Sequence, residues 1–427
     1  MVRFIHAADI HLDSPLKGLE RYEGAPVDEM RGATRAALEN LVALAIDRAV
    51  NFVVIAGDLY DGDWKDHNTG LFFVGRMHRL REAGIPVVMI SGNHDAANKM
   101  TKSLRLPDNV ELLSHGRAAT AALPVLRELG VAIHGRSFGE QAETGNLARD
   151  YPGKKAGMFN IGLLHTSLTG GREEHATYAP CDLDDLRSKG YDYWALGHIH
   201  LRETVCEDPP VVFAGNIQGR HIRERDAKGC CVVELEDGGR PTIEFVPLDV
   251  ARWELCRVDG SKLKQPDDLP VAFAAGLEAL DRKHGGMPLA VRVEVSGRTA
   301  AHAKLVADQG RWTNELRSAA LGVAGGRVWV EKVKLLTQPL DAPRTADLSG
   351  PVAALRECLE ELAADDGELL ALGDALADLR GKLPEELSKG PEGLGFDDPD
   401  RLRGRLREWL REAEPLLMAA LGEGAAS

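Results

Sequence analysis

Five short motifs in the first two hundred or so residues carry side chains that could do chemistry. They are Asp9-Ile10-His11, Gly57-Asp58-Leu59-Tyr60-Asp61, Gly92-Asn93-His94-Asp95, His165 and Gly197-His198-Ile199-His200. Together they offer carboxylate, amide oxygen and imidazole without thiolate, a set that suits manganese, iron or zinc. Two such cations can clamp a phosphate, lower the pKa of a bound water and stabilise in-line attack. The motifs therefore predict a two-metal phosphoesterase, with Asp58 as the natural bridging carboxylate.

Taken singly, each motif has an ordinary structural explanation. Asp-x-His is commonly a pair of surface or capping groups, and Gly-Asp after a strand is often only a turn. A lone histidine such as His165 is more often a satisfied core residue, and His6, inside the first expected strand, is expected to be structural. The combination argues for a site because each motif follows an expected strand, and ligands of α/β sheets collect outside the strand carboxyl ends.

The elements that must position these motifs are short β-branched runs alternating with helices. The expected strands are Phe4–Ala7, Phe52–Ala56, Val87–Ser91, Val131–His134, Asn160–His165, Tyr193–Leu196 and Val211–Ala214. Helical spacing of apolar residues predicts helices over Asp28–Val50 and Thr69–Ala83, the second ended by Gly84 and Pro86. This alternation predicts an α/β sandwich with at least one mixed or parallel sheet.

Beyond about residue 250 the pattern changes. Strands are expected at Leu289–Ser296 and Arg327–Leu336, and helices near Val271–Arg282 and Ala301–Ala319, which together predict a small α+β domain. A segment with two prolines then predicts a linker, after which Ser349 is the expected N-cap of a helical region. The expected division of the chain is 1–250, 251–337, a linker at 338–348, and 349–427.

Composition narrows the class of protein and leaves the substrate open. The net charge of −14 argues against coating nucleic acid by bulk electrostatics, yet a cluster of metal-binding carboxylates is itself acidic. No apolar run approaches the roughly 20 residues that span a bilayer, and no signal-peptide pattern is present, so we expect a cytoplasmic protein without a membrane partner. Six cysteines without a CxxC pair are expected to be thiols, with Cys230 and Cys231 on opposite faces of a strand.

The motifs resemble those of the calcineurin-like metallophosphoesterases, and more narrowly the SbcD nuclease family with its YhaO-type bacterial branch. Residues 11–16 (His-Leu-Asp-Ser-Pro-Leu) are similar to that branch's opening signature, and residues 215–221 (Gly-Asn-Ile-Gln-Gly-Arg-His) follow the last motif as in YhaO-type sequences. The second motif lacks the Arg-Gly extension usual in protein-serine/threonine phosphatases. The resemblance is clearest over about residues 1–250. It implies a sandwich of two β-sheets flanked by helices, a small α+β capping domain and a helical C-terminal segment.

The resemblance also implies roles for individual residues. The ligands it implies for the first metal are Asp9, His11, Asp58 and His200. Those for the second are Asp58, Asn93, His165 and His198. His94 would stabilise transition-state charge or protonate the leaving 3′ oxygen, with Asp95 orienting it. Asp61 stands where some family members carry histidine. This leaves open whether Asp61 takes part in catalysis itself or only contacts the residues that do.

The family's usual metal is manganese and its usual reaction is cleavage of DNA phosphodiesters. The resemblance therefore implies a DNA exonuclease or endonuclease with two Mn²⁺ ions that works in DNA repair. Two alternatives stay open: hydrolysis of a small phosphodiester or phosphomonoester, and a DNA-tethering protein whose own nuclease is vestigial. The DNA nuclease and the hydrolase of small esters would use the same set of metal ligands, so the motifs do not separate these two functions.

Partners follow from the same resemblance. Family members act with an SMC-like ATPase of the SbcC type, which would dock on the helices at about 349–420; the alternative is a helical hairpin packed on its own chain. A homodimer is expected from the family as well. The best local candidates for contacting a DNA backbone are Arg220, His221 and Arg223, although a basic run near a strand edge is equally typical of a solvated loop.

Overall fold

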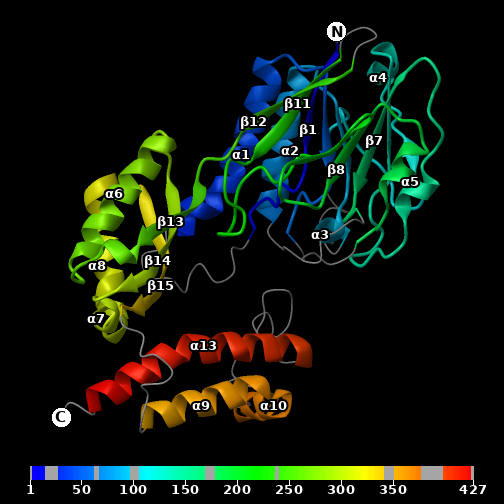
Figure 1. Cartoon of the computed structure of the whole chain (residues 1–427). Helices are drawn as coiled ribbons and strands as arrows, with labels where there is room; N and C mark the ends of the chain where they lie inside the picture. The colour runs from blue at the N-terminus through cyan, green and yellow to red at the C-terminus, as the bar shows by residue number, and fades with distance from the viewer. Residues whose placement is uncertain are drawn as a thin grey trace. The chain divides into compact units, whose positions relative to one another are not determined.

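The computed structural model describes residues 2–14, 27–61, 67–96, 105–168, 178–235, 240–340, 351–376 and 398–424 (Figure 1). The chain divides into two compact units. The first unit comprises Met1–Leu255, Leu280–Arg292 and Ala324–Glu331. The second comprises Cys256–Ala279, Val293–Val323 and Lys332–Ser427.

Two six-stranded sheets build most of the first unit. The first sheet has the order β12-β11-β1-β2-β3-β4 and the second the order β5-β6-β7-β8-β10-β9. Strands of the first sheet are β1 (Val2–Ala7), β2 (Phe52–Ala56), β3 (Val87–Ile90), β4 (Val110–Leu112), β11 (Gly229–Leu235) and β12 (Thr242–Pro247). Strands of the second are β5 (Ala119–Thr120), β6 (Val131–Gly135), β7 (Phe159–His165), β8 (Tyr193–Gly197), β9 (Glu203–Glu207) and β10 (Pro210–Phe213). Each sheet has a parallel centre, β1 to β4 in one and β6, β7, β8 and β10 in the other.

The parallel register makes the central strands end together. Ala7 lies beside Ile55, Ile55 lies beside Met89, and in the other sheet His165 lies beside Gly197. All seven predicted strands are confirmed, with small shifts at their ends. Because the carboxyl ends of the strands coincide, the residues that follow them arrive at one edge of each sheet.

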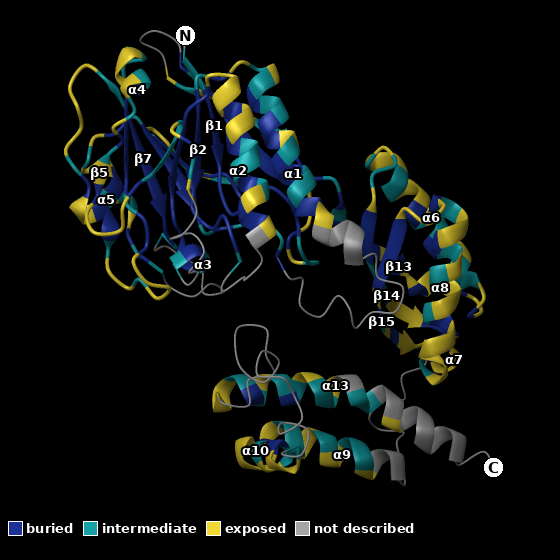
Figure 2. Ribbon diagram, turned by 180° about the vertical axis from the view of Figure 1, so that it is seen from behind, coloured by how far each residue is buried: buried dark blue, intermediate teal, exposed yellow. Residues whose placement is uncertain are grey.

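An apolar core fills the space between the two sheets. Phe4, Val54 and Val88 of the first sheet pack in the same cluster as Ile161 and Ala195 of the second. Burial on both faces explains why the central strands are almost continuously apolar, and each large side chain removed from water contributes roughly 1.5–3 kcal/mol. Figure 2 shows these strands in dark blue, buried between the helices that flank them. The predicted fold class, a two-sheet α/β sandwich, is confirmed.

Helices cover the outer face of the first sheet. The helices of this region are α1 (Val27–Asp47), α2 (His67–Glu82), α3 (Asn93–Ala96), α4 (Pro124–Glu128), α5 (Leu183–Arg187) and the 3₁₀ helix Leu147–Asp150. Leu38, Leu41, Val42 and Ala45 of α1 are all fully buried in one cluster with residues of the first sheet such as Val53. Their spacing of three and four residues places them on a single helix face, as predicted.

Strands at the sheet edges were harder to predict than central ones. β9 and β12 were not predicted, because half of their residues face water and polar side chains interrupt the apolar pattern. β11 pairs antiparallel with β1 and confirms the expected strand around Cys230 and Cys231. Cys230 packs in the core beneath the helices and Cys231 in the core between the sheets, and both are free thiols.

A three-stranded sheet and several helices follow the sandwich. The strands are β13 (Arg252–Asp259), β14 (Leu289–Thr299) and β15 (Val328–Pro339), in that order. The helices are α6 (Asp268–Lys283), α7 (His302–Ala307), α8 (Gln309–Ala324) and the 3₁₀ helix Gly260–Lys262. The helical stretch expected near Ala301–Ala319 is confirmed but consists of two helices, α7 and α8. Asp308 leaves the helical region at φ −134° and ψ 57°, and its carboxylate accepts from the Arg311 N–H at 3.1 Å. Asp308 therefore ends α7 and caps α8.

The described end of the chain is helical. It contains α9 (Pro351–Ala364), α10 (Asp366–Ala375) and α13 (Pro399–Gly424), and α13 contacts both of the others. Leu369, Leu402 and Leu406 form a small buried cluster among them. The predicted N-cap Ser349 and most of the predicted linker lie outside the described residues. None of the described helices has both the length and the apolar character needed to cross a membrane.

His6 of β1 gives the folded chain a dependence on pH. Its Nδ1 lies 3.0 Å from the Tyr193 hydroxyl and its Nε2 lies 3.2 Å from the Leu196 carbonyl oxygen. Burial lowers the pKa of His6 to about 3. The hydrogen bond with the Leu196 carbonyl oxygen acts in the opposite direction, but its effect on the pKa is smaller. Because the pKa is lower in the folded chain, stability should be full above about pH 6.5 and fall as the pH drops towards 3, by roughly 4 kcal/mol.

His6→Gln should weaken this acid sensitivity, since glutamine can bond to both partners without taking up a proton. Thermal unfolding midpoints, measured in EDTA between pH 7 and pH 4, should fall less steeply in the variant than in the wild type. His78→Gln, which changes an exposed histidine of α2, is the matched control and should keep the wild-type slope. Equal slopes in all three proteins would contradict the assignment to His6.

Candidate metal centre

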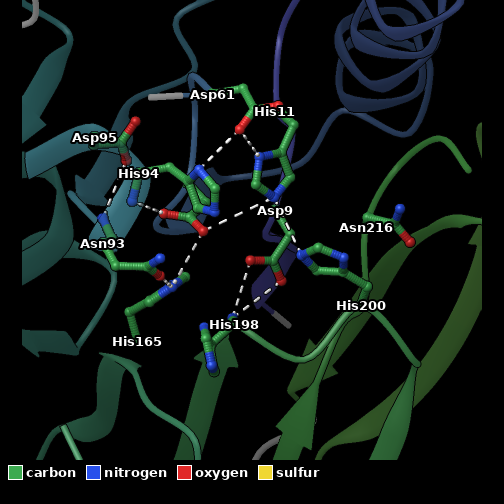
Figure 3. A network of polar contacts seen from close by, with 12 residues as sticks. Asp9, His11, Asp61, Asn93, His94, Asp95, His165, His198, His200 and Asn216 are labelled. Atoms are coloured by element: carbon green, nitrogen blue, oxygen red, sulfur yellow. Dashed lines mark hydrogen bonds and ion pairs between the residues drawn. The ribbon is translucent and has the colours of Figure 1, made fainter. Parts of the chain in front are cut away.

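The five motifs leave the carboxyl ends of β1, β2, β3, β7 and β8 and meet at one edge of the sandwich (Figure 3). The first two motifs stay side by side after their strands end, because the Asp9 N–H donates to the Gly57 carbonyl at 3.1 Å and the His11 N–H to the Asp58 carbonyl at 3.0 Å. The second sheet joins through the Asp9 carboxylate, which accepts from the His198 N–H at 3.0 and 3.1 Å. Backbone hydrogen bonds thus tie the motifs of both sheets together.

Several of the predicted ligands sit on strained backbone. Positive φ angles occur at Asp9 (50°), His11 (45°), Asp58 (52°) and His198 (98°). Non-glycine residues rarely adopt this region, at a cost of order 1–3 kcal/mol each, and keep it only where the surroundings enforce it. Such strain concentrates at functional sites, and here it accompanies the side chains that converge on one point.

Two glycines allow the backbone to approach the converging side chains closely. A Cβ at Gly92 would overlap the Asp58 carboxylate and the His165 ring. A Cβ at Gly197 would overlap the Ala56 carbonyl oxygen. Any larger residue at either position would therefore displace a strand end or a predicted ligand.

One group of potential ligand atoms comes from Asp9, His11 and His200. These atoms all lie within 4.8 Å of one another. The Nε2 atoms of His11 and His200 are 3.1 Å apart, and Figure 3 shows the two rings turned toward each other. The Nδ1 of His11 is buried and has no hydrogen-bond partner among the residues that the structure describes. Two imidazole nitrogens that face each other in a buried site, beside a carboxylate, suit a cation between them.

The second group comes from Asp58, His165 and His198, again within 4.8 Å of one another, and Asp58 also forms a third such group with His11 and His94. The Nε2 of His165 lies 2.9 Å from the Asn93 Oδ1 and 3.4 Å from the Asp58 Oδ2, while its Nδ1 faces the Ala56 carbonyl oxygen at 2.9 Å. The same Asp58 Oδ2 is 3.8 Å from the His11 Nε2. Asp58 therefore belongs to the second group and also lies close to His11 of the first group, as a carboxylate that bridges two cations must.

The electrostatics of the site follow from two almost fully buried carboxylates facing buried imidazoles. Burial raises the pKa of Asp9. Burial also opposes ionisation of Asp58, but His165 outweighs it and holds the pKa of Asp58 well below its ordinary value. In return, although burial lowers the pKa of His165, Asp58 raises it to about 9. The buried negative charge thus demands a cationic partner, and the carboxylate, imidazole and amide donors fit a pair of divalent cations.

Comparison with known proteins decides the family. The model of the calcineurin-like phosphoesterase family matches residues 2–202, and that of the middle domain of metallophosphoesterase YhaO matches residues 253–338. The chain is 34% identical over 295 residues to the uncharacterised metallophosphoesterase YhaO of Bacillus subtilis (strain 168), covering 69% of this chain and 71% of that protein. The chain belongs to the calcineurin-like metallophosphoesterases. It is therefore a metal-dependent phosphodiesterase.

More distant relatives of this metallophosphoesterase are described as nucleases or repair proteins. The chain is 25% identical over 281 residues to the DNA double-strand break repair protein Mre11 of Sulfurisphaera tokodaii, covering 62% of this chain and 67% of that protein. It is also 25% identical over 287 residues to the SbcD component of the nuclease SbcCD from Staphylococcus epidermidis, covering 61% of this chain and 72% of that protein. The predicted relationship to the YhaO and SbcD proteins is confirmed.

His94 of the metallophosphoesterase lies beside the cradle, and its partner is not the one predicted. Its Nδ1 is 2.8 Å from the Asp61 Oδ1. The Asp95 carboxylate instead accepts from the backbone N–H groups of Leu59, Tyr60 and Gly92, at 2.8 to 3.1 Å. The expectation that Asp95 orients His94 is therefore wrong: Asp95 fastens the second motif's loop to the third motif.

Asp61, whose role the sequence left open, orients His94. Its Oδ2 accepts from the Ser14 hydroxyl at 2.6 Å and lies 3.5 Å from Arg220 Nη1. Burial would raise the pKa of Asp61, but the hydrogen bond from His94 and the charge of Arg220 hold it well below its ordinary value. The resulting anion acts on His94: burial lowers the pKa of His94, but the hydrogen bond to Asp61 and the charges of Asp58 and Asp61 together outweigh burial and raise it.

The structure gives Arg220 a different role from the predicted DNA contact. Its side chain is only 12% exposed and is held by Glu224 and Asp61. The prediction that Arg220 contacts a DNA backbone is therefore wrong, because its guanidinium faces carboxylates inside the protein. His221 is half-buried and Arg223 exposed, so both remain candidates for that contact. Sequence reasoning also missed Glu224, which with Asp226 is one of two acidic residues in a largely basic run, and that contrast was the available signal.

Proposed function

We propose that this metallophosphoesterase is a DNA exonuclease or endonuclease that works in DNA repair with two bound manganese ions. The observation that carries the proposal is the convergence of seven predicted ligand side chains on one point. They are Asp9, His11, Asp58, Asn93, His165, His198 and His200. The similarity to proteins described as Mre11 and as part of a nuclease supports DNA as the substrate.

The ligands divide as the two groups of donor atoms suggest. One cation would be held by Asp9, His11, Asp58 and His200. The other would be held by Asp58, Asn93, His165 and His198. When bound, such a pair neutralises charge on the scissile phosphate and lowers the pKa of a bound water. Imidazole and carboxylate donors are compatible with manganese.

The chain's own contribution to the reaction centres on His94. The Asp61 carboxylate accepts a hydrogen bond from the Nδ1–H and thereby orients the ring, which leaves the Nε2 proton for the leaving 3′ oxygen. The raised pKa of His94 favours the protonated ring, which is the form that a general acid requires. Its backbone N–H donates to the Asp58 Oδ1 at 3.0 Å, so the acid is fixed to the same carboxylate that joins the two ligand groups.

The remaining assignments complete the proposal. Residues 1–250 would form the nuclease domain and 251–337 a capping domain, joined through the linker at 338–348 to a helical segment at 349–427. That segment would dock an SMC-like ATPase of the SbcC type, and the description of the staphylococcal relative as one component of SbcCD supports such a partner. A homodimer and a cytoplasmic location belong to the same proposal.

Purified full-length protein should shorten end-labelled linear DNA with manganese and not with EDTA. A small chromogenic phosphodiester is tested in parallel, because the cradle by itself would accept either ester. Cleavage of the DNA supports the proposal, and the ladder of products gives the polarity of digestion. Cleavage of the small ester alone would replace it with a small-molecule phosphodiesterase. Binding of DNA without cleavage of either substrate would favour a tethering protein.

A further inference from the structure

Glu224 is a buried acidic residue that lies behind the metal centre. It belongs to the loop between β10 and β11, and its side chain is 4% exposed. Its Oε1 accepts from the His200 Nδ1 at 2.6 Å and from the Arg220 Nη2 at 3.0 Å. Its Oε2 accepts from the Asn216 Nδ2 at 2.9 Å and from the Arg220 backbone N–H at 2.7 Å. Each of these neighbouring groups donates a hydrogen bond to the Glu224 carboxylate.

The donors around Glu224 determine which nitrogen of His200 carries a proton. The Nδ1 of His200 lies 2.6 Å from the Glu224 Oε1 and 3.2 Å from the Arg220 Nη2. An ionised carboxylate can only accept, so the shorter contact is a hydrogen bond in which Nδ1 donates to Glu224. In the neutral ring the Nε2 is then left as a lone pair. That Nε2 is the atom that lies 3.1 Å from the His11 Nε2, inside the cradle. Glu224 therefore selects the tautomer that can serve as a ligand.

The same loop also holds the backbone of His200. The Lys228 ammonium, on a side chain that is almost entirely buried, donates to the His200 carbonyl oxygen at 2.9 Å. The ring is fastened by Glu224 and the main chain by Lys228, both from the loop that joins β10 to β11. Arg220 extends the network, since its guanidinium bonds to Glu224 and reaches the Asp61 Oδ2 at 3.5 Å. His200 is thus held at its ring by Glu224 and at its main chain by Lys228.

We propose that Glu224 is a positioning residue that controls metal binding at only one of the two positions. By fixing His200, it governs the position formed with Asp9 and His11. At the other position, the nitrogens of His165 face the Asn93 Oδ1 and the Ala56 carbonyl oxygen, each at 2.9 Å, so that ring is held without Glu224. This inference rests on the metal centre proposed above, and it adds a residue that the ligand motifs do not contain.

Glu224→Gln tests the proposal because it keeps the size of the side chain. An amide offers one oxygen and one donor group to a pocket whose neighbours donate, so either His200, or Asn216 and the Arg220 N–H, must face a donor instead of an acceptor. Manganese binding is followed by titration with electron paramagnetic resonance, which separates a coupled pair of ions from a single bound ion. We expect one site to weaken by about 10- to 100-fold and the other to keep its wild-type affinity. At limiting manganese the coupled signal should give way to that of a single ion.

Glu254→Gln is the matched control. Glu254 is 7% exposed, and its Oε1 lies 2.6 Å from the His284 Nε2, so the same substitution breaks an equivalent buried carboxylate–histidine pair away from the ligand motifs. This variant should titrate as the wild type does. Equal weakening of both sites in Glu224→Gln, or two unchanged sites, would overturn the proposal. Weakening in Glu254→Gln of the same size would overturn it as well.

A measurement on the wild type covers the case in which Glu224→Gln does not fold. In metal-free protein labelled with ¹⁵N-histidine, the His200 ring should show its proton on Nδ1, and a proton on Nε2 alone would refute the inference. Failure of the proposed function is distinguishable: a wild type that binds two manganese ions without cutting DNA leaves the titration comparison intact. A wild type that binds no metal would refute both.

Discussion

Asp58→Asn should abolish metal binding and reduce phosphodiester hydrolysis by at least about a thousandfold. Asparagine has the same shape, so the hydrogen bond from the His94 N–H to Oδ1, 3.0 Å long, can survive. The lost charge cannot be replaced, because Asp58 is the carboxylate that lies between His165 at 3.4 Å and His11 at 3.8 Å. The measurements are metal content after dialysis and turnover of DNA and of a chromogenic phosphodiester.

Asp192→Asn provides the control for this substitution. Asp192 precedes β8 at the opposite edge of the second sheet, where its Oδ2 accepts from the Asn160 N–H at 2.7 Å. The same chemical change there should leave both metal content and turnover near the wild-type values. An Asp58→Asn protein that retains two ions and cleaves at the wild-type rate would remove Asp58 from the site.

His94→Gln should have the second largest effect, with a different signature. The predicted ligands do not include His94, so the metal content should stay at the wild-type level while turnover falls by roughly 10²- to 10⁴-fold, the usual range for a lost general acid. The loss should appear in kcat more than in KM, because proton transfer to the leaving oxygen matters in the transition state. A variant that cleaves as fast as the wild type would rule out the assigned role.

The pH dependence separates the acid from the residue that orients it. Asp61 raises the pKa of His94, so the protonated ring persists to higher pH and activity should decline only as the pH rises through that pKa. Asp61→Asn removes the anion, which should move this alkaline decline to lower pH while the metal content is retained. Asp95→Asn should not move the alkaline decline in this way, because the Asp95 carboxylate accepts from backbone N–H groups and not from His94. Identical pH profiles for the Asp61 variant and the wild type would contradict this pairing.

The strands that position the site could be predicted because their signal is local. Phe52–Ala56 and Tyr193–Gly197 are runs of apolar residues buried on both faces, and the motif that follows each begins where the run ends. In parallel sheets the carboxyl ends meet at one edge, so the order of strand and motif was enough to bring the ligands together. The edge strands β9 and β12 escaped prediction because their exposed residues break the apolar pattern.

The division of labour between Asp61 and Asp95 could not be predicted from the chain order. Asp95 is the covalent neighbour of His94, which made it the obvious partner, but successive residues of a helical turn point in different directions. The partner of His94 is Asp61, more than thirty residues earlier, because the loop after β2 lies against the start of α3. Arg220 shows the same dependence, since the basic run that predicted a surface contact says nothing of the buried carboxylates it faces.

The sequence by itself determined the central strands, the family resemblance and the set of side chains offered to the metals, because strand periodicity and the residues that follow a strand are properties of neighbouring positions. The tertiary structure alone decided which carboxylate orients His94 and which holds His200. Asp61 is 33 positions from His94 in the sequence, and Glu224 is 24 positions from His200. The packing of loops at the sheet edge brings each carboxylate within hydrogen-bond distance of its histidine. Hydrogen bonding depends on distances of about 3 Å, and only the folded chain sets these.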